Sequence, residues 1–207
     1  YEDPVEILQH LMIGSEGTLG FMAEITYRTV EEHSHKATAL MIFPDIKTAC
    51  EAVAALKSQP VAAVELMDRA SLRSVDNKAG MPAYFKELPE AAAALLVETR
   101  ALNPAALSTQ VAAVTAAIAA IPTLFPLQFT DRPEEFTRLW AIRQGLFPSV
   151  GSARATGTTV IIEDVAFPLP RLAEATLDLQ ALFRKHGYDE ALIFGHALEG
   201  NLHFVFT

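Results

Sequence analysis

The segment GHALEGNLH, residues 195–203, holds two histidines seven positions apart. On a helix, that spacing would put His196 and His203 two turns apart, whereas helical side chains that meet at one ligand are three or four residues apart. The rings can converge if one histidine ends a strand and the other begins the next, with Gly200 and Asn201 in the turn between them. Imidazole is the commonest metal ligand, so a converging pair would supply half of a divalent-metal site. Two hydrogen-bonded structural histidines are the alternative that the spacing leaves open.

Two adjacent carboxylates, Glu163 and Asp164, interrupt the apolar run TTVIIEDVAFP. If the run is a strand, successive side chains point to opposite faces, and an unpaired buried carboxylate is costly. At least one of the two should therefore face a polar partner, for which Arg143, His196 or a metal ion are candidates. A capping contact with the helix expected to follow is the alternative.

Arg143 lies among apolar residues in the segment LWAIRQGLF, residues 139–147. A guanidinium that emerges from an apolar surface is suited to a bidentate grip on a substrate carboxylate. A surface ion pair is the simpler interpretation of the same pattern.

A glycine-rich segment, GSEGTLG, spans residues 14–20 and carries a serine and a threonine between its glycines. Such a turn lets the backbone approach a bulky ligand and exposes N–H groups to phosphate or carbonyl oxygens. It is neither the dinucleotide fingerprint that opens a helix nor a Walker loop, because no Gly-Lys-Ser/Thr follows. An ordinary glycine-rich turn is the alternative interpretation.

From about residue 35 onward, we expect alternating strands and helices, and these elements must position Arg143, the two carboxylates and the two histidines. Short β-branched or aromatic runs predict strands, and longer segments of 3.6-residue period predict helices. The predicted strands are 21–27, 38–43, 62–67, 93–98, 125–129, 159–166, 191–194 and 202–206. The predicted helices are 46–58, 104–121, 133–147 and 169–186, and the capping residues Asp45, Asn103 and Asp131 precede three of them.

This order of elements predicts an α+β fold, a mostly antiparallel ferredoxin-like sheet with helices packed on one side. It also hints weakly at an internal duplication. We expect residues 1–30 to be the end of a different domain, a strand-turn-strand around the glycine-rich turn, and residues 31–207 to be the main domain. The sequence starts without methionine and stops inside a predicted strand, so we expect an excerpt truncated at its C-terminus.

Composition excludes several classes of protein. The chain has 207 residues, of which 16 are basic and 25 acidic, giving a net charge of −9 without a basic cluster that would attract nucleic acid. The longest apolar stretches, 91–97 and 111–121, are too short or too interrupted to cross a bilayer. The single cysteine, Cys50, cannot form an internal disulfide, which fits a reducing, cytoplasmic compartment. The oligomeric state stays open, a homo-oligomer included.

Five segments together resemble one family. LMIGSEGTLGFMAEITYRTV is similar to the end of the flavin-binding domain in the FAD-linked oxidases related to vanillyl-alcohol oxidase and D-lactate dehydrogenase. The segments 65–72, 139–151, 156–168 and 195–207 resemble, in the same order, the C-terminal cap domain of that family. The segments TVIIEDVAFP and GHALEGNLHF are most similar to those of the large branch of the family, in which the oxidase is joined to an iron–sulfur region and oxidises D-2-hydroxyglutarate. The resemblance implies an FAD-dependent dehydrogenase of a D-2-hydroxy acid, of the D-2-hydroxyglutarate or D-lactate type.

The resemblance also assigns residues. The residues that it places along the FAD are Gly14, Ser15, Glu16, Gly17, Thr18 and Gly20. His196 and His203 would hold a divalent metal, most simply zinc, Asn201 would lie beside the 2-hydroxy acid substrate, and Arg143 would clamp its carboxylate. Electrons would then leave the flavin for an acceptor, for which the iron–sulfur region of that branch is a candidate. A third metal ligand, a glutamate, and a histidine base would both lie beyond Thr207.

Two departures bear on the substrate. The shorter 2-hydroxyglutarate dehydrogenases have a threonine four residues after the arginine, where this chain has Phe147. They have a lysine two residues before the aspartate, where this chain has Ile162. Their contacts to the distal carboxylate therefore do not transfer, and the resemblance leaves the 2-hydroxy acid open.

Two other classes of function compete with this one. The first is a non-catalytic α+β module that binds a ligand or a partner chain. The second is a flavoenzyme for phenolic or ether-lipid substrates, which share the scaffold but generally lack the paired histidines of GHALEGNLH. A yellow protein with one bound metal per chain would favour the dehydrogenase over the module.

Overall fold

The computed structural model describes residues 1–78 and 81–207, except the side chain of Ala153. It divides into two compact units, Tyr1–Glu32 and His33–Thr207, and each is described by itself. In this described part of the chain, no helix combines the length and the apolar character that crossing a bilayer requires.

The first unit holds helix α1 (Pro4–Met12) and the glycine-rich turn. Asp3 begins the helix, because its carboxylate accepts a hydrogen bond from the backbone N–H of Val5 and Pro4 occupies the first turn. The strand predicted over residues 21–27 is not formed: the segment is irregular. A strand needs a hydrogen-bonded neighbour, and no described residue pairs with this segment. The strand-turn-strand expected here is therefore corrected to a helix, a turn and an irregular tail.

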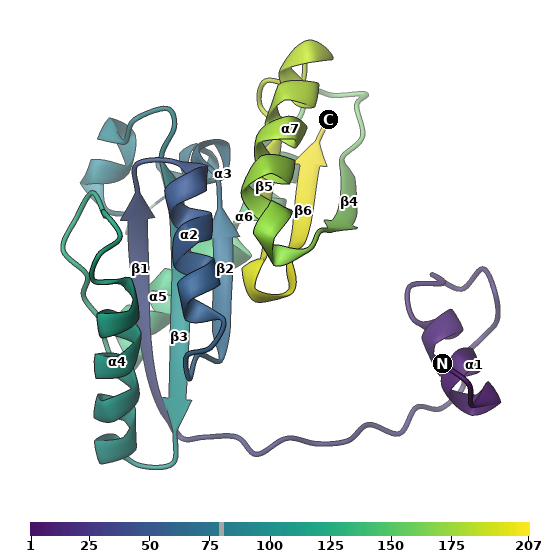
Figure 1. Cartoon of the computed structure of the whole chain (residues 1–207). Coiled ribbons are helices and arrows are strands. Elements are labelled where there is room, and N and C mark those ends of the chain that lie inside the picture. Colours follow the sequence, from purple (N-terminus) through teal and green to yellow (C-terminus); the bar gives the residue numbers. More distant parts are fainter. Residues whose placement is uncertain (79–80) are drawn as a thin grey trace. The chain divides into compact units, whose positions relative to one another are not determined.

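The second unit is built on one six-stranded sheet in which all neighbours are antiparallel. The strands lie in the order β1-β3-β2-β5-β6-β4 (Figure 1). Their bounds are β1 (His35–Phe43), β2 (Ala63–Met67), β3 (Ala93–Ala101), β4 (Ile161–Ala166), β5 (Leu192–His196) and β6 (Asn201–Phe206). The predicted α+β fold with an antiparallel sheet is confirmed.

The sheet consists of two halves with the same topology. In the first half, β1 and β2 are joined by helix α2 (Ile46–Leu56), and β3 lies between them. In the second half, β4 and β5 are joined by helix α7 (Leu172–Lys185), and β6 lies between them. Each half is a split β-α-β unit of ferredoxin-like type, and the halves meet where β2 pairs with β5. The hint of duplication in the element order is thus found in the topology.

Helices cover both faces of this sheet and not one, as the sequence had suggested. Helices α2, α4 and α7 lie on one face and α3, α5 and α6 on the other (Figure 1). A core of buried side chains lies between each group of helices and the sheet. The bounds of the helices not yet given are α3 (Arg69–Val75), α4 (Pro104–Ile118), α5 (Pro133–Gln144) and α6 (Leu146–Ala153). Short 3₁₀ turns η1 (Ala83–Glu87), η2 (Leu169–Arg171) and η3 (Ala197–Glu199) complete the fold. Strands such as β3 are buried on both faces, so they have continuous apolar runs that do not reveal how many helix layers cover them.

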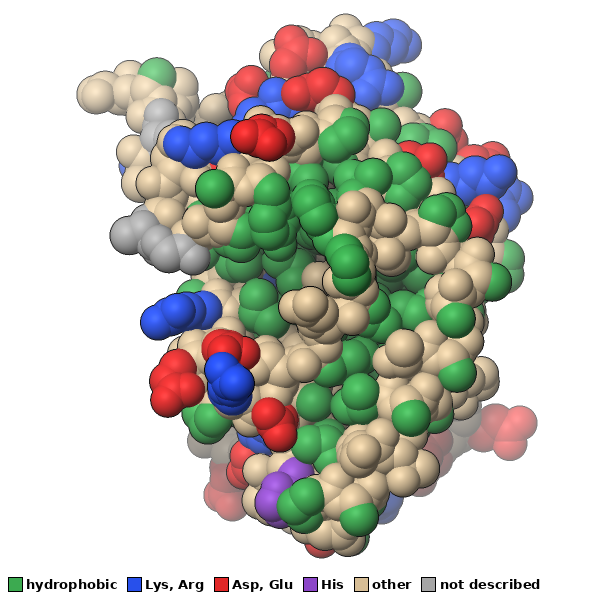
Figure 2. All heavy atoms as spheres, turned by 90° about the vertical axis from the view of Figure 1, so that its left-hand side faces the viewer, with side chains coloured by type: hydrophobic (Ala, Val, Ile, Leu, Met, Phe, Trp, Pro, Cys, Tyr) green, Lys and Arg blue, Asp and Glu red, His purple; other side chains and the backbone are tan. Residues whose placement is uncertain are grey.

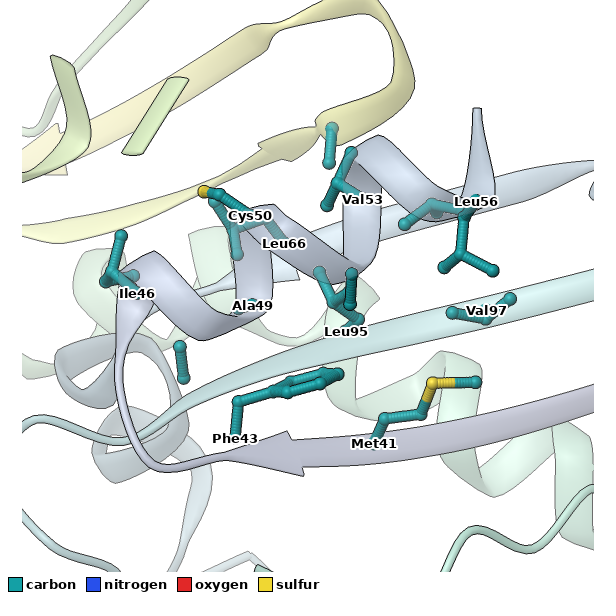
Figure 3. Close-up of a cluster of buried hydrophobic side chains, with 14 of the residues drawn as sticks. Met41, Phe43, Ile46, Ala49, Cys50, Val53, Leu56, Leu66, Leu95 and Val97 are labelled. Atoms are coloured by element: carbon teal, nitrogen blue, oxygen red, sulfur yellow. The ribbon is translucent and has the colours of Figure 1, made fainter. Parts of the chain in front are cut away.

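Helix α2 shows why the first core forms. Asp45 caps it by accepting from the N–H of Thr48 at 2.7 Å. Its apolar positions recur at helical spacing and point onto the strands (Figure 3). Cys50 belongs to this face, and burial raises the pKa of its thiol to about 12, so the thiol stays protonated.

Two predicted elements differ from the structure because of proline. The strand predicted over residues 125–129 is a loop beside β1, joined to it by an isolated bridge between Thr38 and Thr130. Pro126 cannot donate a ladder hydrogen bond in the middle of that run. The helix predicted over residues 133–147 ends at Gln144, and α6 starts anew, because Pro148 has no N–H for the carbonyl of Gln144.

An uncharged stretch of the sequence lies on one side of the second unit. No Asp, Glu, Lys or Arg occurs between Arg100 and Asp131, a stretch that includes α4 and the loop after it. Figure 2 shows the side on which α4 lies, where apolar side chains form a broad band between charged ones. Leu124 and Phe125 are partly exposed there, at 37% and 38%.

Candidate active site

A cluster of polar side chains lies where the two halves of the sheet meet. The strand register sets it up: Glu65 of β2 lies opposite His196 of β5. One step further across the sheet, His203 of β6 lies opposite both Phe194 of β5 and Asp164 of β4. Opposite residues of an antiparallel pair share a face, so the pairing gathers these side chains on one side of the sheet.

Glu65 is the buried centre of the cluster, with 5% of its surface exposed. Its Oε2 accepts from the Nε of Arg143 at 2.8 Å, and its Oε1 lies 2.7 Å from the Nδ1 of His196. A carboxylate can only accept, so Nδ1 of His196 carries the hydrogen. The Nε2 of that ring is then the nitrogen with the free lone pair.

A second carboxylate makes the same contact with the other histidine. Oδ1 of Asp164 is hydrogen-bonded to Nδ1 of His203 and lies 3.4 Å from the amide nitrogen of Asn201. Oδ1 of Asn201 is buried and has no hydrogen-bond partner in the described part of the chain. An unpaired buried acceptor is costly, which marks Asn201 as a residue prepared for a donor from a ligand.

Arg143 reaches the sheet from the end of α5. Its guanidinium lies over the ring of Phe194, with 4.4 Å between Cζ and the ring centroid, while its Nε edge is held by Glu65. The face and one edge of the guanidinium are thus engaged. Among the described residues its terminal nitrogens have no hydrogen-bond partner, so they remain available for an anion.

The two imidazoles are close together, with ring centroids 5.0 Å apart and planes nearly perpendicular. Each has its Nδ1 on a carboxylate and its Nε2 free, which is the arrangement that metal-binding histidines adopt. The chemistry of the pair, two imidazoles with Nδ1 on a carboxylate, is thus compatible with two ligands of a divalent metal. The described residues contain no group of three or more His, Cys, Asp or Glu that would complete such a site.

The glycine-rich turn belongs to the first unit and is described by itself. Gly14, Glu16 and Gly17 all have positive φ, and the carbonyl of Ser15 accepts from both the N–H and the hydroxyl of Thr18. The hydroxyl of Ser15 is buried without a partner among the described residues. A left-handed turn with an unpaired hydroxyl fits close approach of a ligand with acceptor oxygens, such as the phosphates of FAD.

The structure brings together four of the residues singled out in the sequence: Arg143, His196, Asn201 and His203. Their roles stay predictions. One of the adjacent carboxylates does face a polar partner, but the side chain that contacts Asp164 is His203 and not Arg143 or His196. Glu65 was not recognised as a site residue. Its signal was a lone carboxylate inside the apolar run AAVELM, which a strand can bury only with partners.

Comparison with known proteins identifies the second unit. Residues 32–207 match the family described as FAD linked oxidases, C-terminal domain. The chain belongs to this family. The family was expected from the sequence, and the match confirms that expectation for this FAD-linked oxidase domain.

Among curated proteins, the domain is similar to D-lactate dehydrogenase [cytochrome], mitochondrial, of Arabidopsis thaliana, with 32% identity over 95% of this chain and 33% of that protein. It is also similar to the glycolate oxidase subunit GlcD of Bacillus subtilis, with 28% identity over 95% of this chain and 40% of that protein. The chain thus spans about a third to two fifths of the length of these relatives.

Among solved structures, an alkyldihydroxyacetonephosphate synthase shares the fold of the chain. The TM-score is 0.68, and the match covers 96% of this chain and 40% of that one. At 15% identity it supports the fold of this FAD-linked oxidase domain and says nothing about its substrate.

Proposed function

We propose that this chain is the substrate-binding part of an FAD-dependent dehydrogenase that oxidises a D-2-hydroxy acid to the 2-oxo acid. The observation that carries the proposal is the cluster in which a half-engaged guanidinium, two carboxylate-bound imidazoles and an unpaired amide oxygen share one face of the sheet. A 2-hydroxy acid offers one carboxylate and one hydroxyl, which match these groups. Two relatives are named for D-lactate dehydrogenase and glycolate oxidase activity, which agrees with this class of substrate.

Arg143 would bind the substrate carboxylate. Its side chain is 14% exposed, so an ion pair formed there is poorly screened by water. Its Nε already neutralises Glu65, and the terminal nitrogens would grip the incoming carboxylate. The stacking on Phe194 keeps the plane of the guanidinium fixed, which lowers the entropy lost on binding.

The histidines and Asn201 would receive the hydroxyl. The unpaired Oδ1 of Asn201 is an acceptor for its proton, and the lone pair on Nε2 of His196 or His203 can take that proton when C2 is oxidised. In the metal form of this proposal, both Nε2 atoms are ligands of a divalent ion such as zinc. Such an ion, when bound, would lower the pKa of the substrate hydroxyl.

The glycine-rich turn would contact the flavin through Gly14, Ser15, Glu16, Gly17, Thr18 and Gly20. FAD, when bound, supplies the acceptor for the hydride that leaves C2. The free Ser15 hydroxyl and the left-handed backbone support this role. The same proposal includes three further points. The substrate is D-lactate or D-2-hydroxyglutarate, the electrons pass to an iron–sulfur region, and the protein is cytoplasmic.

The test uses the complete flavoprotein, a panel of D- and L-2-hydroxy acids and an artificial acceptor dye. The variant His203→Ala is expected to lower turnover about a hundredfold or more, because it removes a proton-accepting or metal-binding group, while the flavin absorbance is unchanged. Metal content, measured on the same samples, decides whether a metal is involved.

The matched control is His186→Ala, which removes an exposed histidine at the end of α7. Its turnover should equal that of the unchanged protein. Wild-type turnover in His203→Ala would rule out the proposed role of His203. A colourless protein that oxidises none of the acids would leave the non-catalytic module as the better description.

A further inference from the structure

We infer that Glu65 is a positioning residue that sets, through one carboxylate, both the direction of the Arg143 guanidinium and the tautomer of His196. The inference rests on the proposed function for its consequence in catalysis, but not for its geometry. The proposed chemistry assigns no role to Glu65. Its carboxylate is also too deeply buried to contact the substrate.

The guanidinium has two fixed contacts, and only one of them is directional. The ring of Phe194 holds its plane but permits rotation within that plane. The hydrogen bond from Nε to Oε2 of Glu65 stops that rotation and turns the terminal nitrogens away from the carboxylate. Glu65 therefore decides which edge of Arg143 is offered to an anion.

A separate contact anchors α5 one turn earlier. Nε1 of Trp140 donates to Oε2 of Glu98 at 2.6 Å, and Glu98 also accepts from Thr38 and Arg100. The helix therefore does not depend on Glu65 for its place on the sheet. The role of Glu65 is confined to the end of the Arg143 side chain and to His196.

The tautomer of His196 follows from the chemistry of the carboxylate. Glu65 has no hydrogen to donate, so Nδ1 must be protonated and Nε2 bare. Glutamine has the same shape as glutamate, but an NH₂ group that donates hydrogen bonds replaces one of the accepting oxygens. Its oxygen would stay with Nε of Arg143, which is always a donor, and its NH₂ would face Nδ1 of His196. The hydrogen would then move to Nε2, and the ring would lose its lone pair toward the substrate.

The decisive variant is Glu65→Gln in the complete flavoprotein. After treatment of both proteins with a chelator that removes any bound metal, nitrogen NMR of ¹⁵N-histidine-labelled protein is expected to show Nε2 of His196 without a hydrogen in the unchanged protein and Nδ1 without a hydrogen in the variant, with the signal assigned through His196→Gln. With the 2-hydroxy acid that the panel identifies, KM should rise about tenfold, which corresponds to about 1.4 kcal/mol of binding.

Two further variants separate the effects. Arg143→Lys should raise KM but leave the His196 tautomer as in the unchanged protein, because Glu65 is intact. Trp140→Phe, the matched control, removes the other carboxylate contact of α5 and should lower stability while leaving both KM and the tautomer unchanged. An equal rise of KM in Trp140→Phe would mean a general loosening of α5 and would overturn the inference.

The remaining outcomes are also decisive. An unchanged His196 tautomer, or an unchanged or lower KM, in Glu65→Gln would overturn the positioning role. If that variant does not fold, Glu65→Asp replaces it: the charge stays, but the shorter side chain cannot reach both partners, so a wild-type KM would contradict the inference. A protein that oxidises no 2-hydroxy acid would refute the proposed function alone, because the NMR result still tests Glu65.

Discussion

At the scale of single residues, Asp68 shows how a buried carboxyl serves structure alone. It caps α3 by accepting from the N–H of Ser71 at 2.8 Å, and Gln180 of α7 donates to its other oxygen at 3.3 Å. Burial raises the pKa of this carboxyl, and the hydrogen bonds only partly offset the effect. The native state therefore favours the protonated form more than the unfolded chain does.

This raised pKa predicts a pH dependence of stability. The contribution of Asp68 is fully present below the unfolded value of 3.8 and is lost as pH rises toward the folded pKa, because the native state binds more protons in that window. The variant Asp68→Asn keeps a capping oxygen and cannot ionise. Urea unfolding over a pH series should show the variant gaining free energy of unfolding, relative to the unchanged protein, as pH rises. A difference that stays constant with pH would contradict the assignment.

At the scale of elements, the connection between β5 and β6 joins the strands that carry the two histidines, and it depends on glycine. Gly200 has φ +65°, and a Cβ on it would lie 1.9 Å from the carbonyl oxygen of Phe167. The N–H of Phe167 also donates to the carbonyl of Gly200 at 2.9 Å, so the backbone there cannot retreat easily. The separation of His196 from His203 is thus set by a position that only glycine fits.

The variant Gly200→Ala is accordingly expected to lower the free energy of unfolding by about 3 kcal/mol or more, from left-handed strain and the clash together. Gly151→Ala is the control, because Gly151 lies in α6 with negative φ and open space around its Cα. That change should raise stability by about 0.5–1 kcal/mol, since alanine favours a helix. Chemical denaturation of both variants measures the contrast. Equal effects would mean that the turn is not constrained as described.

The sequence predicted the start of a helix well where a single capping residue determines it. Asp45 and Asn103 cap α2 and α4 as expected, and both accept from the N–H three residues on. Asp131, the third predicted cap, does not cap α5, whose N-cap position is Arg132 without a side-chain hydrogen bond. Two errors arose where the effect of a proline was overlooked: Pro126 lies inside the strand predicted over 125–129, and Pro148 directly follows the helix predicted over 133–147. At the start of α1 the sequence has Asp3 as the cap and Pro4 in the first turn, the same signal that was used for other helices, so this helix could also have been predicted.

At the scale of the whole molecule, strand register was the information that the sequence lacked. The convergence of His196 and His203 could be expected because seven residues and one turn join them. The approach of Glu65 to His196 could not, since 131 positions separate them and only the β2–β5 pairing makes them neighbours. The second helix layer was missed for a similar reason, because strands buried on both faces show no alternation.

The twofold repetition in the sheet has a consequence for how such a site arises. A single β-α-β-β half has an edge strand ready to pair, β2 in one half and β5 in the other, and joining two halves removes both edges. Glu65 comes from one half and His196 from the other, so neither alone holds a complete pocket. An isolated half would expose that edge strand, which could pair with the same strand of a second copy. Joining both halves in one chain lets them differ: the second half carries both imidazoles, and the first carries Glu65, the carboxylate that contacts His196 and Arg143.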